Sequence, residues 1–197
     1  MSPELISSSS ALLMHLGISF SSNVDNLFKS NFSLQTAKCN INSNLINNFA
    51  LYKKFIMYQL ENGWVQSVKQ VPSPNYDLRP ANIEISLLVI HGISLPPGIF
   101  DNEFVEEFFT NQLDHTKDPY FEQLLNLRVS SHLYIKRSGE IIQFVSLDHR
   151  AWHAGLSEYN GRSNCNDFSI GIELEGTDNI KYTNQQYMSL IELSKCC

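Results

Sequence analysis

Residues 169–176 read S-I-G-I-E-L-E-G, and this alternating stretch decides the fold. Its period of two is that of a β-strand with one apolar side and one polar side. The apolar side carries Ile170, Ile172 and Leu174. The polar side carries Glu173 and Glu175, and Gly171 is expected to leave open space beside Glu173. Two interpretations follow: a strand that presents a carboxylate to a site, or an amphipathic edge strand with two solvated glutamates.

A second stretch, S-L-L-V-I-H at residues 86–91, favours the first interpretation. An apolar run of this kind predicts a strand that is buried on both faces. Gly92 and the prolines that follow are expected to end this strand just after His91. Ligand-binding groups gather where the strands of open α/β sheets end, so His91 lies where a metal ligand is expected. The alternative is a histidine with a structural role.

Helix signals complete the predicted architecture. Asp101 is expected to cap one helix, and Asp118, followed by Pro119, to cap another. Thr183 and Gln186 form a capping box for a third helix. The apolar residues expected to face the core from these helices are Phe104, Val105, Phe108, Phe109, Phe121, Leu124, Leu125, Tyr187, Leu190, Ile191 and Leu193. With a hairpin turn predicted at residues 137–139, the pattern indicates an α/β fold with a mixed sheet flanked by helices.

Composition excludes several classes of partner. The formal net charge of -6 gives no electrostatic reason to expect nucleic acid or an anionic membrane surface as a partner. The four cysteines show no C-x-x-C spacing, so free thiols in a reducing compartment are expected. We therefore expect a cytoplasmic protein, and we expect it to be a monomer.

Residues 1–56 differ in composition from the rest of the chain, being rich in serine and asparagine. This segment is predicted to be a poorly ordered extension, or upstream sequence translated from a wrong start. The domain proper is expected to span residues 57–197.

Four motifs together resemble the zinc-dependent N-acetylmuramoyl-L-alanine amidases. They are V-I-H-G-I-S-L-P-P-G (residues 89–98), L-R-V-S-S-H (127–132), R-A-W-H-A-G (150–155) and C-N-D-F-S-I-G-I-E-L-E-G-T-D (165–178). The chain is most similar to the cytoplasmic type that acts on 1,6-anhydro-N-acetylmuramoyl peptides in peptidoglycan recycling. The resemblance covers residues 61 to about 193 and implies a sheet like that of the amidases and peptidoglycan-recognition proteins.

The resemblance also implies a role for individual residues. His91 matches the first zinc ligand, and Glu173 matches the general base that takes a proton from the attacking water. Arg128 matches an arginine that contacts the substrate peptide. The motif of Trp152, His153 and Ala154 matches one that lines the substrate cleft. For His132 two interpretations stay open, a hydrogen-bonded sheet histidine or a residue that supports the site.

The chain departs from the family pattern in two places. Gly92 stands where an asparagine is usual, and the chain stops before the segment in which the family carries its other two zinc ligands, a histidine and an aspartate, and a lysine. Two hypotheses follow. One is a zinc amidase that cleaves the bond between (1,6-anhydro-)N-acetylmuramic acid and L-alanine, truncated at its C-terminus and inactive as given. The other is a non-catalytic muropeptide-binding protein of the same fold.

Overall fold

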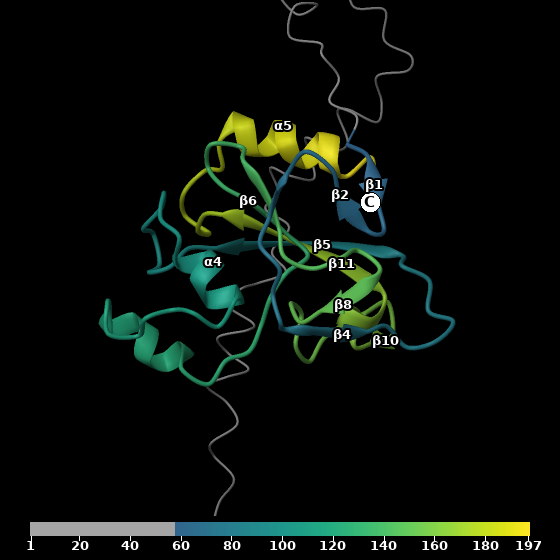
Figure 1. Cartoon of the computed structure of the whole chain (residues 1–197), viewed down its shortest axis with the longest axis horizontal. Coiled ribbons are helices and arrows are strands. Elements are labelled where there is room, and N and C mark those ends of the chain that lie inside the picture. The colour runs from purple at the N-terminus through teal and green to yellow at the C-terminus, as the bar shows by residue number, and fades with distance from the viewer. Residues whose placement is uncertain (1–57) are drawn as a thin grey trace, which may run out of the picture. The chain divides into compact units, whose positions relative to one another are not determined.

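A five-stranded mixed sheet forms the centre of the computed structural model, which describes residues 58–197 (Figure 1). The strand order is β3-β7-β6-β11-β5. These strands are β3 (Lys69–Gln70), β5 (Leu87–Ile93), β6 (Leu133–Ile135), β7 (Ile141–Gln143) and β11 (Ser169–Glu175). β11 runs parallel to both β5 and β6, whereas β6 and β7 form an antiparallel hairpin. The serine- and asparagine-rich segment at 1–56 lies outside the described residues.

Three pairs of short antiparallel strands surround this sheet. They are β1 (Leu60–Glu61) with β2 (Trp64–Val65), β4 (Tyr76–Leu78) with β8 (His149–Ala151), and β9 (Glu158–Tyr159) with β10 (Arg162–Ser163). The β4–β8 pair is held by the stacked rings of Tyr76 and His149, whose centroids lie 4.9 Å apart. It is held further by Arg150, which donates two hydrogen bonds of 2.6 Å to the carboxylate of Asp77.

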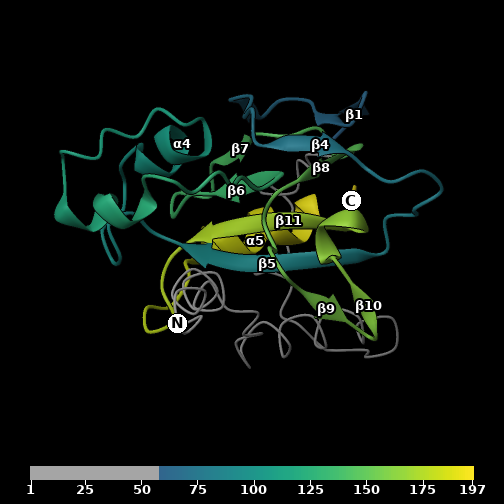
Figure 2. The ribbon, with the colours of Figure 1, turned by 90° about the horizontal axis from the view of Figure 1, so that it is seen from below.

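Helices cover both faces of the central sheet. The helical elements are α4 (Phe104–Phe109), η1 (Pro119–Leu124), η2 (Cys165–Asp167) and α5 (Asn184–Leu193). Figures 1 and 2 show α5 along one face of β11 and β5, with α4 beyond the other face. The expected α/β architecture, a mixed sheet flanked by helices, is therefore confirmed.

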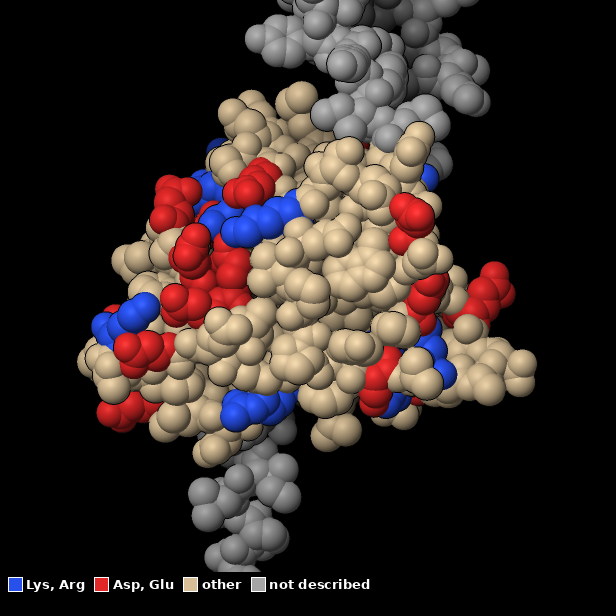
Figure 3. All heavy atoms as spheres, in the orientation of Figure 1, with Lys and Arg blue, Asp and Glu red and all other residues tan. Residues whose placement is uncertain are grey.

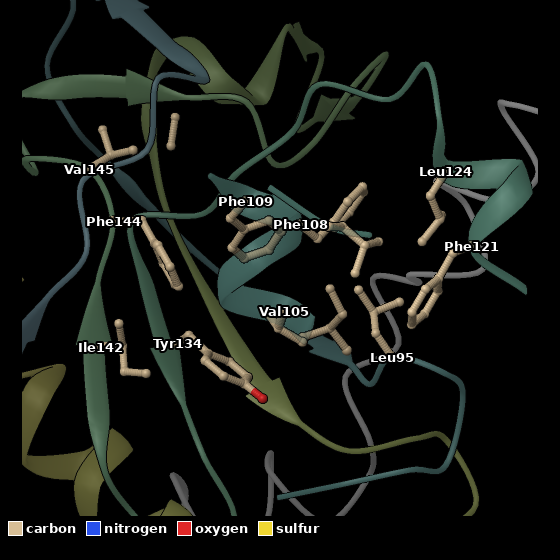
Figure 4. Packing of buried hydrophobic residues seen from close by; sticks show 13 residues of the cluster. Leu95, Val105, Phe108, Phe109, Phe121, Leu124, Tyr134, Ile142, Phe144 and Val145 are labelled. Atoms are coloured by element: carbon tan, nitrogen blue, oxygen red, sulfur yellow. The ribbon is translucent and has the colours of Figure 1, made fainter. Parts of the chain in front are cut away.

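Each face of the sheet has its own apolar core. Under α4 and η1, Phe109 meets Phe144 edge to face with ring centroids 5.1 Å apart, and Tyr134 and Ile142 complete the layer (Figure 4). Under α5 the second cluster joins the apolar side of β11 to the helix. Its β11 and α5 members are Ile170, Ile172, Leu174, Leu190 and Leu193. Burying each such side chain stabilises the fold by about 1.5–3 kcal/mol. Because the apolar side of β11 packs against α5, its polar side faces α4.

Several local predictions are confirmed. β11 begins and ends within the alternating stretch, and the hairpin turn lies between β6 and β7. Thr183 accepts a hydrogen bond from the backbone N–H of Gln186, whose side chain accepts one from the N–H of Thr183, so the capping box is present. Asp118 accepts a hydrogen bond from the backbone N–H of Tyr120 and caps the 3₁₀ helix η1.

Three expectations about these elements are wrong. β5 does not end after His91 but continues to Ile93, because Gly92 and Ile93 stay paired in register with β11. Asp101 caps no helix, since the side chain of Asn102 accepts the hydrogen bond from the N–H of Phe104. Leu125 does not face the core but is 47% exposed, because η1 is a 3₁₀ helix and turns its side chains faster than an α-helix does.

The surface shows no strongly basic face in the view of Figure 3, where Lys and Arg are interspersed with Asp and Glu. Within residues 58–197, every helix is too short or too polar to cross a lipid bilayer. Cys165, Cys196 and Cys197 are free thiols, as expected, and Cys39 lies outside the described residues.

Candidate active site

The candidate site is a row of side chains that crosses three neighbouring strands. Parallel pairing sets Glu173 of β11 beside His91 of β5 on one side and beside Tyr134 of β6 on the other. His91 is 5% exposed, Glu173 4% and Tyr134 fully buried. Both residues that the sequence singles out for chemistry therefore occupy adjacent positions on the α4 face of the sheet.

Glu173 is a buried carboxyl group. Its Oε2 atom has no hydrogen-bond partner among the described residues. Burial disfavours the charged form and raises the pKa of Glu173 to about 8. The interpretation of residues 169–176 as an edge strand with two solvated glutamates is therefore wrong, because β11 lies between β5 and β6 and buries both carboxylates.

Glu175 lies on the same face of β11, but its carboxylate is fully engaged. Its Oε1 accepts a hydrogen bond of 2.8 Å from the backbone N–H of Asp101, and its Oε2 accepts one of 2.9 Å from the N–H of Arg137. Glu175 thus anchors the loop before α4 and the turn of the β6–β7 hairpin. This difference in partners separates a structural carboxylate from one that can exchange a proton.

His91 heads a chain of contacts that runs away from Glu173. Its Nε2 lies 3.0 Å from Nδ1 of His153, and Nε2 of His153 lies 3.0 Å from the hydroxyl of Ser169. The imidazole of His153 occupies the space beside Gly171, where an added Cβ would come within 2.4 Å of the ring. The open space expected there is therefore absent, because a side chain from another segment fills it.

The C-N-D-F turn holds the segment that carries His153. Asn166 Oδ1 accepts hydrogen bonds from the backbone N–H groups of His153 and Ala154, at 3.2 Å and 2.8 Å. Arg79 then ties the turn to β11, since its guanidinium donates to the carbonyl oxygens of Asn166 and Ser169 at 3.0 Å and 2.9 Å. These contacts fix the backbone around the histidine pair.

His132 is a hydrogen-bonded sheet histidine, as one of its two interpretations has it. Its Nδ1 accepts a hydrogen bond of 3.0 Å from the N–H of Gly171, so its proton lies on Nε2, 3.0 Å from the carbonyl oxygen of His149. Burial lowers the pKa of His132 to about 3, so the ring is neutral at physiological pH. Its ring meets that of His153 edge to face at 5.6 Å, so it supports the histidine pair as well.

A family model described as N-acetylmuramoyl-L-alanine amidase matches residues 81–197, the part of the chain that contains His91, His153 and Glu173. The chain belongs to the N-acetylmuramoyl-L-alanine amidase family. This amidase is 52% identical over 136 residues to the 1,6-anhydro-N-acetylmuramyl-L-alanine amidase AmpD of Escherichia coli K12, covering 69% of the chain and 74% of that protein.

Other relatives agree. The AmpD protein of Haemophilus influenzae is 49% identical over 135 residues, covering 68% of this amidase and 73% of that protein. A crystal structure of an AmpD derivative superposes with a TM-score of 0.69 at 51% identity, over 70% of this amidase and 77% of that chain. The resemblance drawn from the motifs is thereby confirmed.

The residues predicted to contact the substrate of this amidase differ from one another in their exposure to solvent. Arg128 is exposed on the loop before β6, where it donates to the carbonyl oxygens of Leu125 and Leu127 and lines a pocket with Phe108 and Leu124. Trp152 and Ala154 are half-buried. His153 is 5% exposed and contacts His91, so its side chain lies inside the fold and not at the surface. A role for these four residues in binding substrate stays a prediction.

The family implies a zinc ion, and the donors present do not make up its site. Among residues 58–197, no three His, Cys, Asp or Glu side chains are grouped so that they could hold a metal ion. His91 is one imidazole donor and Glu173 is the neighbouring carboxyl, whereas a catalytic zinc needs three protein ligands. The described residues therefore do not fit a complete zinc site.

Gly92, which stands where the family usually has an asparagine, lies against the side chain of Tyr182. A Cβ at this position would lie 2.4 Å from the hydroxyl oxygen of Tyr182. The tyrosine thus takes the room beside the strand that a larger residue at 92 would need.

Proposed function

We propose that this amidase hydrolyses the amide bond between the lactyl group of 1,6-anhydro-N-acetylmuramic acid and L-alanine, and so acts in the cytoplasm in the recycling of peptidoglycan. The observation that carries the proposal is the buried carboxyl group of Glu173, which lies in register with His91 and whose Oε2 has no hydrogen-bond partner within residues 58–197. The proposal is also supported by the sequence identity of this chain to the AmpD amidases, which is 52% for the Escherichia coli protein and 49% for the Haemophilus influenzae protein. The substrate is accordingly a muropeptide, and the protein works as a monomer.

Glu173 supplies proton transfer in this proposal. It takes a proton from water as the water oxygen forms a bond to the amide carbon. It then gives the proton to the nitrogen of L-alanine as the carbon–nitrogen bond breaks, which leaves a carboxylic acid and an amine. A pKa of about 8, raised by burial, suits both steps because the group can accept and donate near neutral pH.

The other predicted residues take supporting roles. His91 is proposed as the ligand through which this chain contributes to the zinc ion of the family. The exposed guanidinium of Arg128 suits a carboxylate of the stem peptide, which it can bind with two parallel hydrogen bonds. Trp152, His153 and Ala154 are proposed to border the sugar and the first amino acid.

The test is to incubate the 197-residue chain with 1,6-anhydro-N-acetylmuramoyl tripeptide and to follow release of the peptide by mass spectrometry. Glu173→Gln should abolish release without loss of the folded state, since it removes the proton acceptor and changes little else. Glu158→Gln, on the exposed strand β9, is the matched control and should behave as wild type. Saturable binding measured by calorimetry, with no release by wild-type protein supplied with zinc, would instead favour a muropeptide-binding protein.

A further inference from the structure

Asn75 is a buried residue whose side-chain amide joins three separate segments of the chain. It is 2% exposed, and its Nδ2 donates to the carbonyl oxygen of Val129 at 2.7 Å. The same nitrogen lies 3.2 Å from the carbonyl oxygen of Phe109, the last residue of α4. The amides of Asn75 and Asn111 bond each other in both directions, at 2.9 Å and 3.0 Å. The loop before β4, the end of α4 and the segment before β6 are therefore fixed to one another.

The backbone of Asn75 extends these contacts to the segment of Trp152. Its carbonyl oxygen accepts a hydrogen bond of 2.7 Å from the hydroxyl of Ser130, which is 1% exposed. The N–H of Ser130 in turn donates to the carbonyl oxygen of Trp152 at 3.1 Å. Asn75 also directly precedes β4, in which Tyr76 pairs with Ala151, the residue before Trp152. Two routes therefore tie Asn75 to the backbone of Trp152.

The two ends of this network carry residues that are predicted to contact the substrate. Arg128 directly precedes Val129, and its exposed guanidinium is the group proposed to bind a carboxylate of the stem peptide. Asn111 lines the same pocket as Arg128. At the other end, Trp152 is proposed to border the sugar. The contacts of Asn75 therefore fix where the backbone at Arg128 lies relative to the backbone at Trp152.

We propose that Asn75 is a positioning residue, which sets the distance between Arg128 and Trp152 and so matches the cleft to a sugar and a peptide carried by one molecule. This inference rests on the proposed function, from which it takes the roles of Arg128 and Trp152. Two linked groups bind more tightly than either alone only where the spacing of their sites suits the link. A change in spacing therefore weakens binding of the whole muropeptide more than binding of its peptide part.

The position requires an amide, because its neighbours include both acceptors and a donor. The carbonyl oxygens of Val129 and Phe109 can only accept, whereas Nδ2 of Asn111 donates. Alanine at 75 would leave these groups without their partner inside the fold, and aspartate would set a carboxylate oxygen against carbonyl oxygens. Either change releases the three segments from one another.

The experiment compares two probes on the full 197-residue chain carrying Glu173→Gln, so that no substrate is cleaved during the measurement. The probes are 1,6-anhydro-N-acetylmuramoyl tripeptide and the free tripeptide of the same sequence, each titrated by calorimetry. Adding Asn75→Ala should weaken binding of the muropeptide by about tenfold and change binding of the free tripeptide by less than about twofold. Partial unfolding of the variant would weaken both probes alike, so the difference between them separates spacing from stability.

A milder variant keeps the test open if Asn75→Ala fails to fold. Residue 111 has a φ of 60°, which glycine adopts readily, so Asn111→Gly removes the paired amide and leaves the backbone unstrained. It should weaken binding of the muropeptide by about threefold, again with little change for the free tripeptide. Asn82→Gly is the matched control, because Asn82 is also an exposed asparagine, with a φ of 61°, but lies in the loop before β5. It should bind both probes as the parent does.

Equal losses for the two probes in folded Asn75→Ala or Asn111→Gly would overturn the proposal, since they would show damage to one subsite and not to the spacing. Unchanged binding of the muropeptide would overturn it too, and so would a parent protein that binds neither probe. Hydrolysis by the wild-type chain is measured separately. A muropeptide that binds as expected but is not cleaved would refute the proposed function alone. An active amidase whose variants lose both probes equally would refute this inference alone.

Discussion

Replacing Glu173 with glutamine should make the fold more stable at alkaline pH, although the same change should abolish amide hydrolysis. The reason is the pKa of Glu173, which burial raises from 4.5 to about 8. Below 4.5 the carboxyl is protonated in both the folded and the unfolded chain and costs nothing. Between these values the unfolded chain ionises while the folded chain keeps its proton, so wild-type stability falls as pH rises, and above about 8 the loss is complete.

The size of the effect follows from those two values. The span from 4.5 to about 8 corresponds to about 5 kcal/mol at most, since each pH unit is worth about 1.36 kcal/mol. Between about pH 5 and about pH 9 the wild-type free energy of unfolding should therefore fall by about 4 kcal/mol relative to Glu173→Gln. Glutamine has nearly the same shape and no charge, so the variant lacks this pH dependence.

Urea denaturation of both proteins across this pH range, with a chelator present, gives the free energies of unfolding. Glu175→Gln is the control: an amide cannot accept both backbone N–H bonds from Asp101 and Arg137, so this variant should lose about 1–3 kcal/mol at every pH. A difference between wild type and Glu173→Gln that stays constant with pH would refute the reasoning, because it would mean that Glu173 titrates normally in the fold.

Three further variants test the surroundings of the site. Gly171→Ala should cost about 1–3 kcal/mol in thermal denaturation, because its Cβ overlaps the ring of His153, and a wild-type melting temperature would contradict that packing. Arg79→Lys should cost about 2–4 kcal/mol in urea denaturation, since an ammonium group cannot reach the four carbonyl oxygens that the guanidinium contacts, and a loss below about 0.5 kcal/mol would show those contacts to be dispensable. Hydrogen bonds from Arg150 lower the pKa of Asp77, so its contribution should be present above 3.8 and lost as pH falls through the lower folded value. Asp77→Asn should remove that acid-side loss, which should be under about 1 kcal/mol because the pair is partly exposed, and an unchanged acid profile would contradict the ion pair.

The sequence predicted the features that depend on local pattern. The alternation around Glu173 predicted β11 and its two faces, because successive side chains of a strand point to opposite faces of the sheet. The capping box of Thr183 and Gln186 formed for a similar reason, since its partners are three residues apart and need no tertiary contact.

Features that depend on partners distant in sequence were missed. Because glycine has no side chain, the sequence predicts open space beside Gly171. The ring of His153, which comes from another segment of the chain, fills that space. The strand carrying His91 was ended too early, since pairing with β11 outweighs the glycine at 92. The sequence assigned no role to Arg79, Asn166 or Ser169, although the motif at residues 165–178 contains the last two. Side chains that bind backbone carbonyls and N–H groups leave no compositional signature.

The parallel pairing of β5 with β11 has a consequence for how the protein is made. Neighbouring parallel strands must be joined by a long crossover, so His91 and Glu173 can meet only after the chain between them has been synthesised. His91 and His153, in contact through their rings, are 62 positions apart along the chain. Contacts of such long range form late and slowly in folding. The pairing of His91 with Glu173 is thus expected to form late in the folding of residues 58–197, after local elements such as the β6–β7 hairpin.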